Sequence, residues 1–169
     1  MSVEKVLTTE QVVPRLRSHR ESGENIVFTN GCFDLIHAGH VRYLTHAKSL
    51  GDVLVVGLNS DESVRLIKDS GRPIVTEDQR AEMLAGLTCV DYVVFFDDPD
   101  PHHLIRAVSP DILVKGADWE ESAIVGADLV TSSGGRVERI RLVPGISTSI
   151  IIQRIVERYS NRQDTGNDA

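Results

Sequence analysis

A near-continuous apolar run at residues 53–58 (VLVVGL) constrains the fold more than any other stretch of the chain. A strand without polar alternation is covered on both faces, as in a parallel sheet that carries helices on either side. Comparable short segments lie at residues 26–29, 91–96, 111–116 and 137–143, with helical periodicity between them. This alternation predicts an α/β fold, with a Rossmann-like, doubly wound parallel sheet of five strands in a single domain.

The two ends of the chain carry helical patterns. Residues 9–21 predict a leading helix, so we expect residues 1–23 to precede a main domain at residues 24–159. Ser147-Thr148 is typical of a helix cap, and the helix after it has one apolar face. That face is formed by Ile151, Ile152, Ile155, Val156 and Tyr159. The polar residues 160–169 predict a disordered tail.

A further helix is predicted to begin after Thr76, which has the form of a capping box with the three residues that follow it. Met83, Leu84 and Leu87 form its apolar face, and Arg80 lies on the same face in the first turn. We therefore expect the Arg80 side chain to point at a specific partner.

The charge of the chain excludes several classes of function. A net charge of −7 leaves no basic field for general binding of nucleic acids or anionic membranes. No apolar run is long enough to span a bilayer, and the first residues lack the order of a secretory signal. Cys32 and Cys89 form neither a metal-binding spacing nor a disulfide framework. We therefore expect a cytoplasmic protein, in which Cys32 is a small strand-end residue rather than a nucleophile.

Residues 30–40 join the end of a strand to the start of a helix. His37 and His40 are three residues apart, so both imidazoles lie at the first turn if the helix begins near Ala38. Backbone N–H groups and the helix dipole at such a turn attract phosphate. Gly31 and Gly39 allow the backbone to approach a ligand closely. This stretch therefore predicts a phosphate site with two histidines.

Several alternatives concern the groups around these histidines. A zinc ion would need a third ligand, and only Asp34 is near in sequence, so a phosphate site is favoured over a metal site. Asp34 itself either caps the turn or orients a nucleotide, and both alternatives are open. Lys68 and Arg72 are either solvated charges of an irregular loop or phosphate clamps, which is also open.

Parallel topology is expected to gather polar side chains at one edge of the sheet, because ligands bind beyond the carboxyl ends of the strands. The residues expected there are Asn30, His37, His40, Asn59, Asp61, Arg80, Lys115, Ser147 and Thr148. Lys115 ends an apolar strand, and we expect it to have an anionic partner. Trp119 either belongs to the core or lines a substrate pocket.

Two motifs resemble those of a known family. Residues 31–40 (GCFDLIHAGH) resemble the G-x-F-D-x-x-H-x-G-H signature of the cytidylyltransferase-like nucleotidyltransferases, and residues 145–149 (GISTS) resemble their late G-I-S-T-T motif. The resemblance covers about residues 24–158, so residues 24–159 are interpreted as a nucleotidyltransferase domain. Val143 stands where the glycerol-3-phosphate cytidylyltransferases carry an arginine. The chain is most similar to the stand-alone D-glycero-β-D-manno-heptose 1-phosphate adenylyltransferases at residues 29–34, 59–61, 71–73, 113–116, 118 and 125–127.

The resemblance implies in-line attack of a sugar phosphate on the α-phosphorus of ATP, which yields ADP-heptose for the lipopolysaccharide core and releases pyrophosphate. It implies catalytic roles for His37, His40, Lys68, Arg80 and Thr148. The histidines and Thr148 would bind the triphosphate, and Lys68 with Arg80 would clamp the leaving group. The nucleotide would also contact Asn30, Gly31, Cys32, Phe33, Asp34, Gly39, Lys115, Gly116 and Ser147. The substrate would contact Asn59, Asp61, Arg72, Asp118 and Trp119.

The family also implies partners. We expect Mg²⁺ to bridge the substrate phosphates without a dedicated protein ligand, a homodimer, and a separate sugar kinase upstream. A cytidylyltransferase that uses CTP and glycerol 3-phosphate or another phosphorylated alcohol is an alternative. A non-catalytic nucleotide sensor and a redox protein built on Cys32 and Cys89 are the others.

Overall fold

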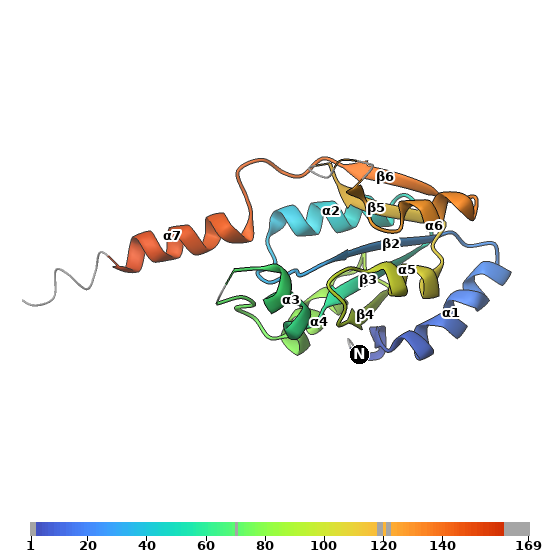
Figure 1. Cartoon of the computed structure of the whole chain (residues 1–169), viewed down its shortest axis with the longest axis horizontal. Helices are drawn as coiled ribbons and strands as arrows, with labels where there is room; N and C mark the ends of the chain where they lie inside the picture. The colour runs from blue at the N-terminus through green and yellow to red at the C-terminus, as the bar shows by residue number, and fades with distance from the viewer. Residues whose placement is uncertain (1–2, 70, 118–119, 121–122, 161–169) are drawn as a thin grey trace, which may run out of the picture.

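The computed structural model of the chain describes residues 3–69, 71–117, 120 and 123–160. Within these residues the backbone forms one parallel six-stranded sheet with the strand order β1-β4-β3-β2-β5-β6 (Figure 1). The strands are β1 (Val6–Leu7), β2 (Ile26–Gly31), β3 (Val53–Asn59), β4 (Tyr92–Phe96), β5 (Ile112–Gly116) and β6 (Arg136–Ile140). The α/β class and the parallel sheet are thus confirmed.

The expected number of strands was wrong by one. Val6 and Leu7 form the short edge strand β1, which pairs with Val93 and Val94 of β4. Two residues are too few for a periodic pattern, so the sequence gives no signal for this strand. At the other edge β6 ends at Ile140, three residues earlier than expected.

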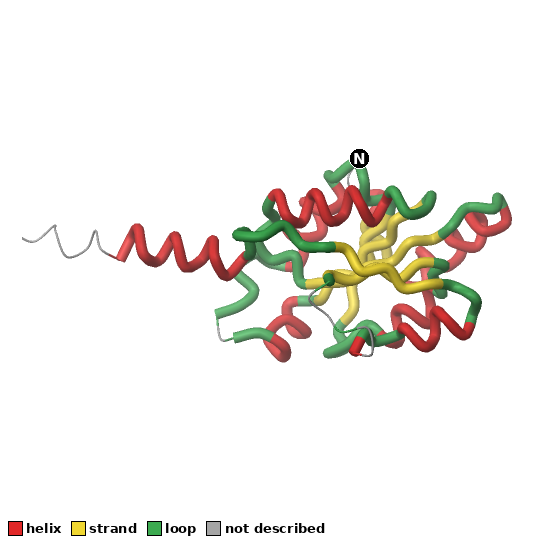
Figure 2. Tube along the Cα trace, turned by 90° about the horizontal axis from the view of Figure 1, so that it is seen from above, coloured by secondary structure: helices red, strands yellow, loops and turns green. Residues whose placement is uncertain are grey.

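Helices cover both faces of the sheet (Figure 2). On one face lie α2 (Ala38–Lys48) and α4 (Glu77–Ala85), and on the other lie α1 (Thr9–Glu21), α5 (His102–Val108) and α6 (Ala127–Ser132). Successive residues of β3 alternate between the two cores: Val53 and Val55 face α1 and α5, whereas Leu54 and Val56 face α2 and α4. This double coverage explains the unbroken apolar run.

Helix α4 corrects two details of the expected pattern. Thr76 precedes the helix, but its side chain accepts no capping hydrogen bond. The carboxylate of Glu77 accepts instead from the backbone N–H of Asp61, 2.5 Å away. Met83 is exposed, because the inward face of the helix consists of Arg80, Ala81, Leu84 and Ala85.

The helix α3 (Asp61–Ile67) was not predicted. It begins directly after β3, where the Ser60 hydroxyl accepts from the backbone N–H of Ser63. Val64 is its one buried apolar residue, whereas Leu66 and Ile67 are exposed, so this seven-residue helix has almost no core-facing apolar pattern. Ser60 and Asp61, which the sequence suggested only as polar groups at a strand end, therefore begin a helix at the carboxyl edge of the sheet.

Strand β2 lies in the middle of the sheet, and the chain runs outward from it in both directions. It first forms β3 and β4 on one side and later β5 and β6 on the other, which creates a topological switch point between β2 and β5. The β2–β3 ladder continues to Gly31 paired with Leu58, but the β2–β5 ladder ends at Phe28 paired with Leu113. The carboxyl ends of β2 and β5 thus extend past their shared ladder.

The last helix, α7 (Thr148–Ser160), is confirmed, but it extends away from the sheet (Figure 1). None of its residues is buried, and Ile155, Val156 and Tyr159 are exposed by 50%, 55% and 61%. In the described part of the chain, no helix combines the length and hydrophobicity that crossing a membrane requires.

Candidate functional site

The turn between β2 and α2 places two imidazoles side by side at the switch point. His37 is the N-cap of α2, and its Nδ1 accepts from the backbone N–H of His40 at 3.3 Å. The two rings stack with centroids 3.8 Å apart and planes 15° apart. The Phe33 ring meets His40 edge-on at 5.2 Å. The spacing of the histidines had predicted this common first turn.

Burial favours the neutral form of both histidines. It lowers the pKa of His37, and together with the neighbouring His37 it lowers the pKa of His40 to about 4. Among the residues that the structure describes, His40 Nδ1 is a buried side-chain atom with no hydrogen-bond partner. Such an atom is costly to leave unsatisfied. The site therefore holds neutral imidazoles, one with an unused nitrogen, beside the positive end of a helix.

The two sequence motifs meet at Gly39. A Cβ atom at this position would lie 2.9 Å from the His37 ring and 3.2 Å from Cγ2 of Ile146. Ile146 belongs to the late motif, more than a hundred residues further along the chain. Only glycine allows the histidine helix and the late motif to approach this closely. Next to Ile146, the Ser147 hydroxyl accepts from the backbone N–H of Ile150 at 3.2 Å, which confirms the predicted cap.

Asp34 fixes the segment that precedes α4. Its side chain is 1% exposed and accepts from the backbone N–H groups of Ile74 and Val75, each at 2.8 Å, and from Arg72. Burial alone would raise the pKa of Asp34, but the hydrogen bonds from Val75, Ile74 and Arg72 hold it below its ordinary value. Asp34 was expected either to cap its own turn or to orient a nucleotide. The observed contacts are structural, but they hold residues 74–75 rather than the turn of Asp34 itself.

Arg80 is fully buried and bonded to protein atoms. Its Nε donates to Val75 O at 2.9 Å and its Nη1 to Cys32 O at 2.6 Å. Nη1 also donates to Asn59 O at 2.8 Å, and Nη2 pairs with the Asp61 carboxylate at 2.7 Å. The expected specific partner exists, but these contacts are not those of a pyrophosphate clamp.

Other expected residues flank the switch point. Lys115 Nζ donates to Asn30 Oδ1 across the ends of β5 and β2, and Gly116 ends β5. Asn59 is buried and donates to the Ser63 hydroxyl at 2.9 Å. Burial raises the pKa of Cys32, which disfavours its thiolate and hence a nucleophilic role.

The remaining expected residues lie in different surroundings. Lys68 is the exposed C-cap of α3, and Thr148 is the half-buried first residue of α7. Asp118 and Trp119 lie outside the described residues. Among those residues, no group of three or more His, Cys, Asp or Glu side chains could hold a metal ion.

Sequence reasoning missed the contribution of Ile74 and Val75, which act through their backbone groups. Their only signal is two β-branched apolar residues within an otherwise polar loop. It also missed Ile146, whose contact with the histidine helix depends on the tertiary fold.

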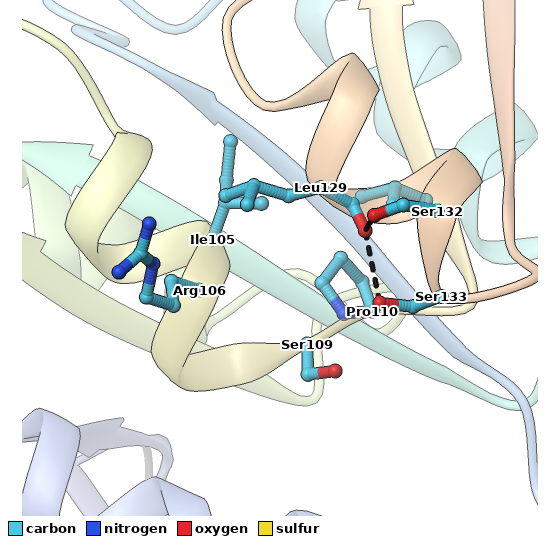
Figure 3. A pocket seen from close by; sticks show the side chains of 8 residues that line it. Ile105, Arg106, Ser109, Pro110, Leu129, Ser132 and Ser133 are labelled. Carbon is cyan, nitrogen blue, oxygen red and sulfur yellow. Dashed lines mark hydrogen bonds between the residues drawn. The ribbon is translucent and has the colours of Figure 1, made fainter.

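A separate hollow between α5 and α6 is not part of this site. Arg106, Ser109, Pro110 and Ser133 contribute to its lining (Figure 3). Ser109 precedes β5, so the hollow lies toward the amino ends of the strands, opposite the histidines.

The chain matches a known family model and curated bacterial proteins. The cytidylyltransferase-like family model matches residues 28–154. The bifunctional protein HldE of Syntrophotalea carbinolica is 54% identical over 155 residues, covering 92% of this chain and 32% of that protein. The bifunctional protein HldE of Trichlorobacter lovleyi is 50% identical over 159 residues, covering 94% and 32%. The chain thus spans about a third of the length of these curated relatives.

A solved structure agrees with the fold. The crystal structure of the lipopolysaccharide core biosynthesis protein from Thermoplasma volcanium GSS1 superposes with a TM-score of 0.60 at 30% sequence identity. The match covers 72% of this chain and 98% of that chain.

Proposed function

The chain belongs to the cytidylyltransferase-like family and is a nucleotidyltransferase, and on this premise we propose that it transfers the adenylyl group of ATP to a heptose 1-phosphate. A phosphate oxygen of the sugar attacks the α-phosphorus in line. The bond from the α-phosphorus to the bridging oxygen breaks, and the products are ADP-heptose and pyrophosphate.

The meeting of the two motifs at Gly39 and Ile146 supports this proposal most directly. It brings two neutral imidazoles, the start of α2 and the late motif to one edge of the sheet. Phosphoryl transfer depends mainly on positioning and on neutralising developing charge. His37 and His40 would donate hydrogen bonds to the triphosphate, and the α7 N-terminus with Thr148 would approach its β- and γ-phosphates.

Magnesium would arrive with the nucleotide as MgATP. Two carboxylates beside the histidine turn already have protein partners. Asp34 accepts hydrogen bonds from backbone N–H groups and from Arg72, and Asp61 pairs with Arg80. Such a donor set fits a metal that is held by phosphates and water rather than by protein ligands.

The names of the relatives support the choice of sugar. The solved relative is named as a lipopolysaccharide core biosynthesis protein and the curated relatives as HldE, and the resemblance of residues 29–34 and 113–116 to heptose 1-phosphate adenylyltransferases makes heptose the acceptor that we propose. The acceptor carries a phosphate at C1, so a sugar kinase must act before this chain. A homodimer also stays a prediction.

The decisive experiment crosses two nucleotides with two acceptors. Purified chain is mixed with ATP or CTP and with heptose 1-phosphate or glycerol 3-phosphate, and pyrophosphate release is measured. We expect turnover with ATP and heptose 1-phosphate, with ADP-heptose identified by mass spectrometry. Turnover only with CTP would replace the proposal by a cytidylyltransferase, and nucleotide binding without turnover would indicate a sensor.

A further inference from the structure

The Phe33 backbone has a conformation that phenylalanine rarely adopts. Its φ is +47°, in the left-handed region. A bulky residue keeps this conformation only where its surroundings determine it strongly. The Phe33 ring lies beside Gly31 at the end of β2, where a Cβ atom on Gly31 would be 3.1 Å from Cε2 of Phe33. The same ring packs against the His40 ring in a T-shaped arrangement. The turn thus aims the aromatic ring at the histidine.

Two buried, opposite charges hold this turn from both sides. On the preceding side, Arg80 Nη1 donates to the carbonyl of Cys32 at 2.6 Å. On the following side, Asp34 accepts from the backbone N–H groups of Ile74 and Val75. Arg80 and Asp34 are 0% and 1% exposed, so water does not compete for these contacts.

The contacts close into a ring that passes through one residue. Val75 donates its N–H to Asp34 and accepts from Arg80 Nε through its carbonyl. From Arg80 the ring returns to Cys32, and the backbone of Cys32, Phe33 and Asp34 completes it. A closed ring of this kind resists rotation of the Phe33 peptide units, because any rotation breaks a buried hydrogen bond.

His40 depends on this turn for its orientation. Its ring is packed between His37, which stacks on it at 3.8 Å, and Phe33, whose ring centroid lies 5.2 Å away. Phe33 belongs to the turn that Arg80 and Asp34 hold. His37 is the titratable group that acts on His40 directly.

We propose that Arg80 and Asp34 are positioning residues that keep Phe33 in its left-handed conformation and thereby set the place of the His40 ring. Only the link from His40 to turnover rests on the proposed function. On this proposal, the buried Arg80 acts on the reaction through the histidine turn rather than by contact with the leaving group.

The test measures His40 itself by NMR titration of its ring, without substrate. In the native chain we expect a pKa near 4, the burial effect described above. In Arg80→Lys and in Asp34→Asn the turn relaxes, water reaches the ring, and the His40 pKa rises by at least one unit. Under the proposed function, kcat falls at least tenfold in both variants, while the KM for ATP changes less than threefold.

A control removes an ion pair elsewhere, between two side chains that are 29% and 34% exposed. Asp91 pairs with Lys48 at 2.5 Å and accepts from the backbone N–H of Leu54, at the start of β4 and away from the histidines. Asp91→Asn is expected to lower the melting temperature without moving the His40 titration. A shift of the same size in Asp91→Asn would reduce the effect to general loosening and overturn the proposal.

A double substitution gives a second test that does not require the Arg80 variant alone to fold. Phe33→Gly removes both the ring and the backbone strain, so it should raise the His40 pKa by itself. Adding Asp34→Asn to Phe33→Gly should then add less than a third of the shift that Asp34→Asn causes in the native background. Additive shifts, or an unchanged His40 titration in folded Asp34→Asn, would overturn the proposal. Absence of turnover with an intact titration result would refute the proposed function alone.

Discussion

The early and late motifs reach the same site with very different support. The turn at residues 30–40 is held by buried charges, because Arg80 and Asp34 together tie it to residues 74–75 and 59–61. The late motif touches the histidine helix through Ile146 and continues into α7, which has no buried residue. The histidine turn is therefore preorganised by the fold, whereas few contacts with the fold hold the start of α7 in place.

This difference suggests that the two halves of the site have different functions. A rigid turn suits the imidazoles, because catalysis by hydrogen-bond donors requires that they be fixed before the charge develops. A lightly held helix terminus suits phosphates that must bind and leave. Each of the following predictions alters one side of this comparison.

The largest effect is expected for loss of the Arg80 guanidinium. Arg80→Met removes a fully buried guanidinium and leaves the half-buried Asp61 carboxylate and the carbonyls of Cys32 and Asn59 without their donor, so the free energy of unfolding should fall by about 3–5 kcal/mol. Urea denaturation at pH 7 measures it. Arg154→Met on exposed α7 is the control, with a change of no more than about 0.5 kcal/mol. Equal changes would abolish the contrast between the two halves.

Loss of a histidine should affect turnover rather than folding. His40→Ala removes one transition-state donor, so kcat should fall roughly a hundredfold, which corresponds to about 2.7 kcal/mol. Steady-state pyrophosphate release measures the loss, and circular dichroism verifies the fold. His103→Ala on α5 serves as control, because that side chain is 81% exposed and contacts Asp98 rather than the two histidines. Unchanged turnover of His40→Ala would remove the histidine from the mechanism.

Acid should destabilise the histidine turn before it affects other parts. The His40 pKa is about 4 in the fold, while a histidine in an unfolded chain titrates near about 6.5. Between these values the unfolded chain binds more protons, so stability is fully present above pH ~6.5 and is lost as the pH falls toward ~4. We expect a loss of about 1–2 kcal/mol, since partial exposure reduces the effect. Urea titrations at pH 7, 5.5 and 4.5 should show that the free energy of unfolding falls with pH, and this dependence should be weaker in His40→Gln.

The smallest effect is expected on α7. Ile155 is half exposed, so Ile155→Ala should change the free energy of unfolding by no more than about 0.5 kcal/mol. Leu84→Ala in buried α4, by contrast, should cost about 2–5 kcal/mol. Denaturation at several protein concentrations is the measurement. A larger, concentration-dependent loss in Ile155→Ala would show that α7 is covered in the predicted homodimer.

The sequence predicted the features that repeat or have fixed spacing. The unbroken apolar run at residues 53–58 predicted a sheet covered on both faces, and the two glycines and two histidines predicted the turn that begins α2. Such signals are local, because the side-chain period and the helical turn are set by the backbone.

The rest depended on groups that residue types do not reveal. The position of Arg80 before Leu84 showed that it faces inward, but its acceptors include three backbone carbonyls, which every residue carries. The amphipathic pattern of α7 predicted a helix with an apolar face, but not whether the same chain covers that face. The two residues of β1 are too short for any pattern.

That short strand has a consequence for how the molecule meets its neighbours in solution. An uncovered sheet edge offers free N–H and C=O groups to other chains and invites aggregation. Val6 and Leu7 cover the edge of β4, and Lys5 Nζ anchors this cover by donating to Val90 O at 2.7 Å. The opposite edge, β6, carries Arg136 and Glu138, which pair at 2.9 Å. One edge is shielded by a two-residue strand and the other by charge, which together disfavour growth of the sheet from molecule to molecule.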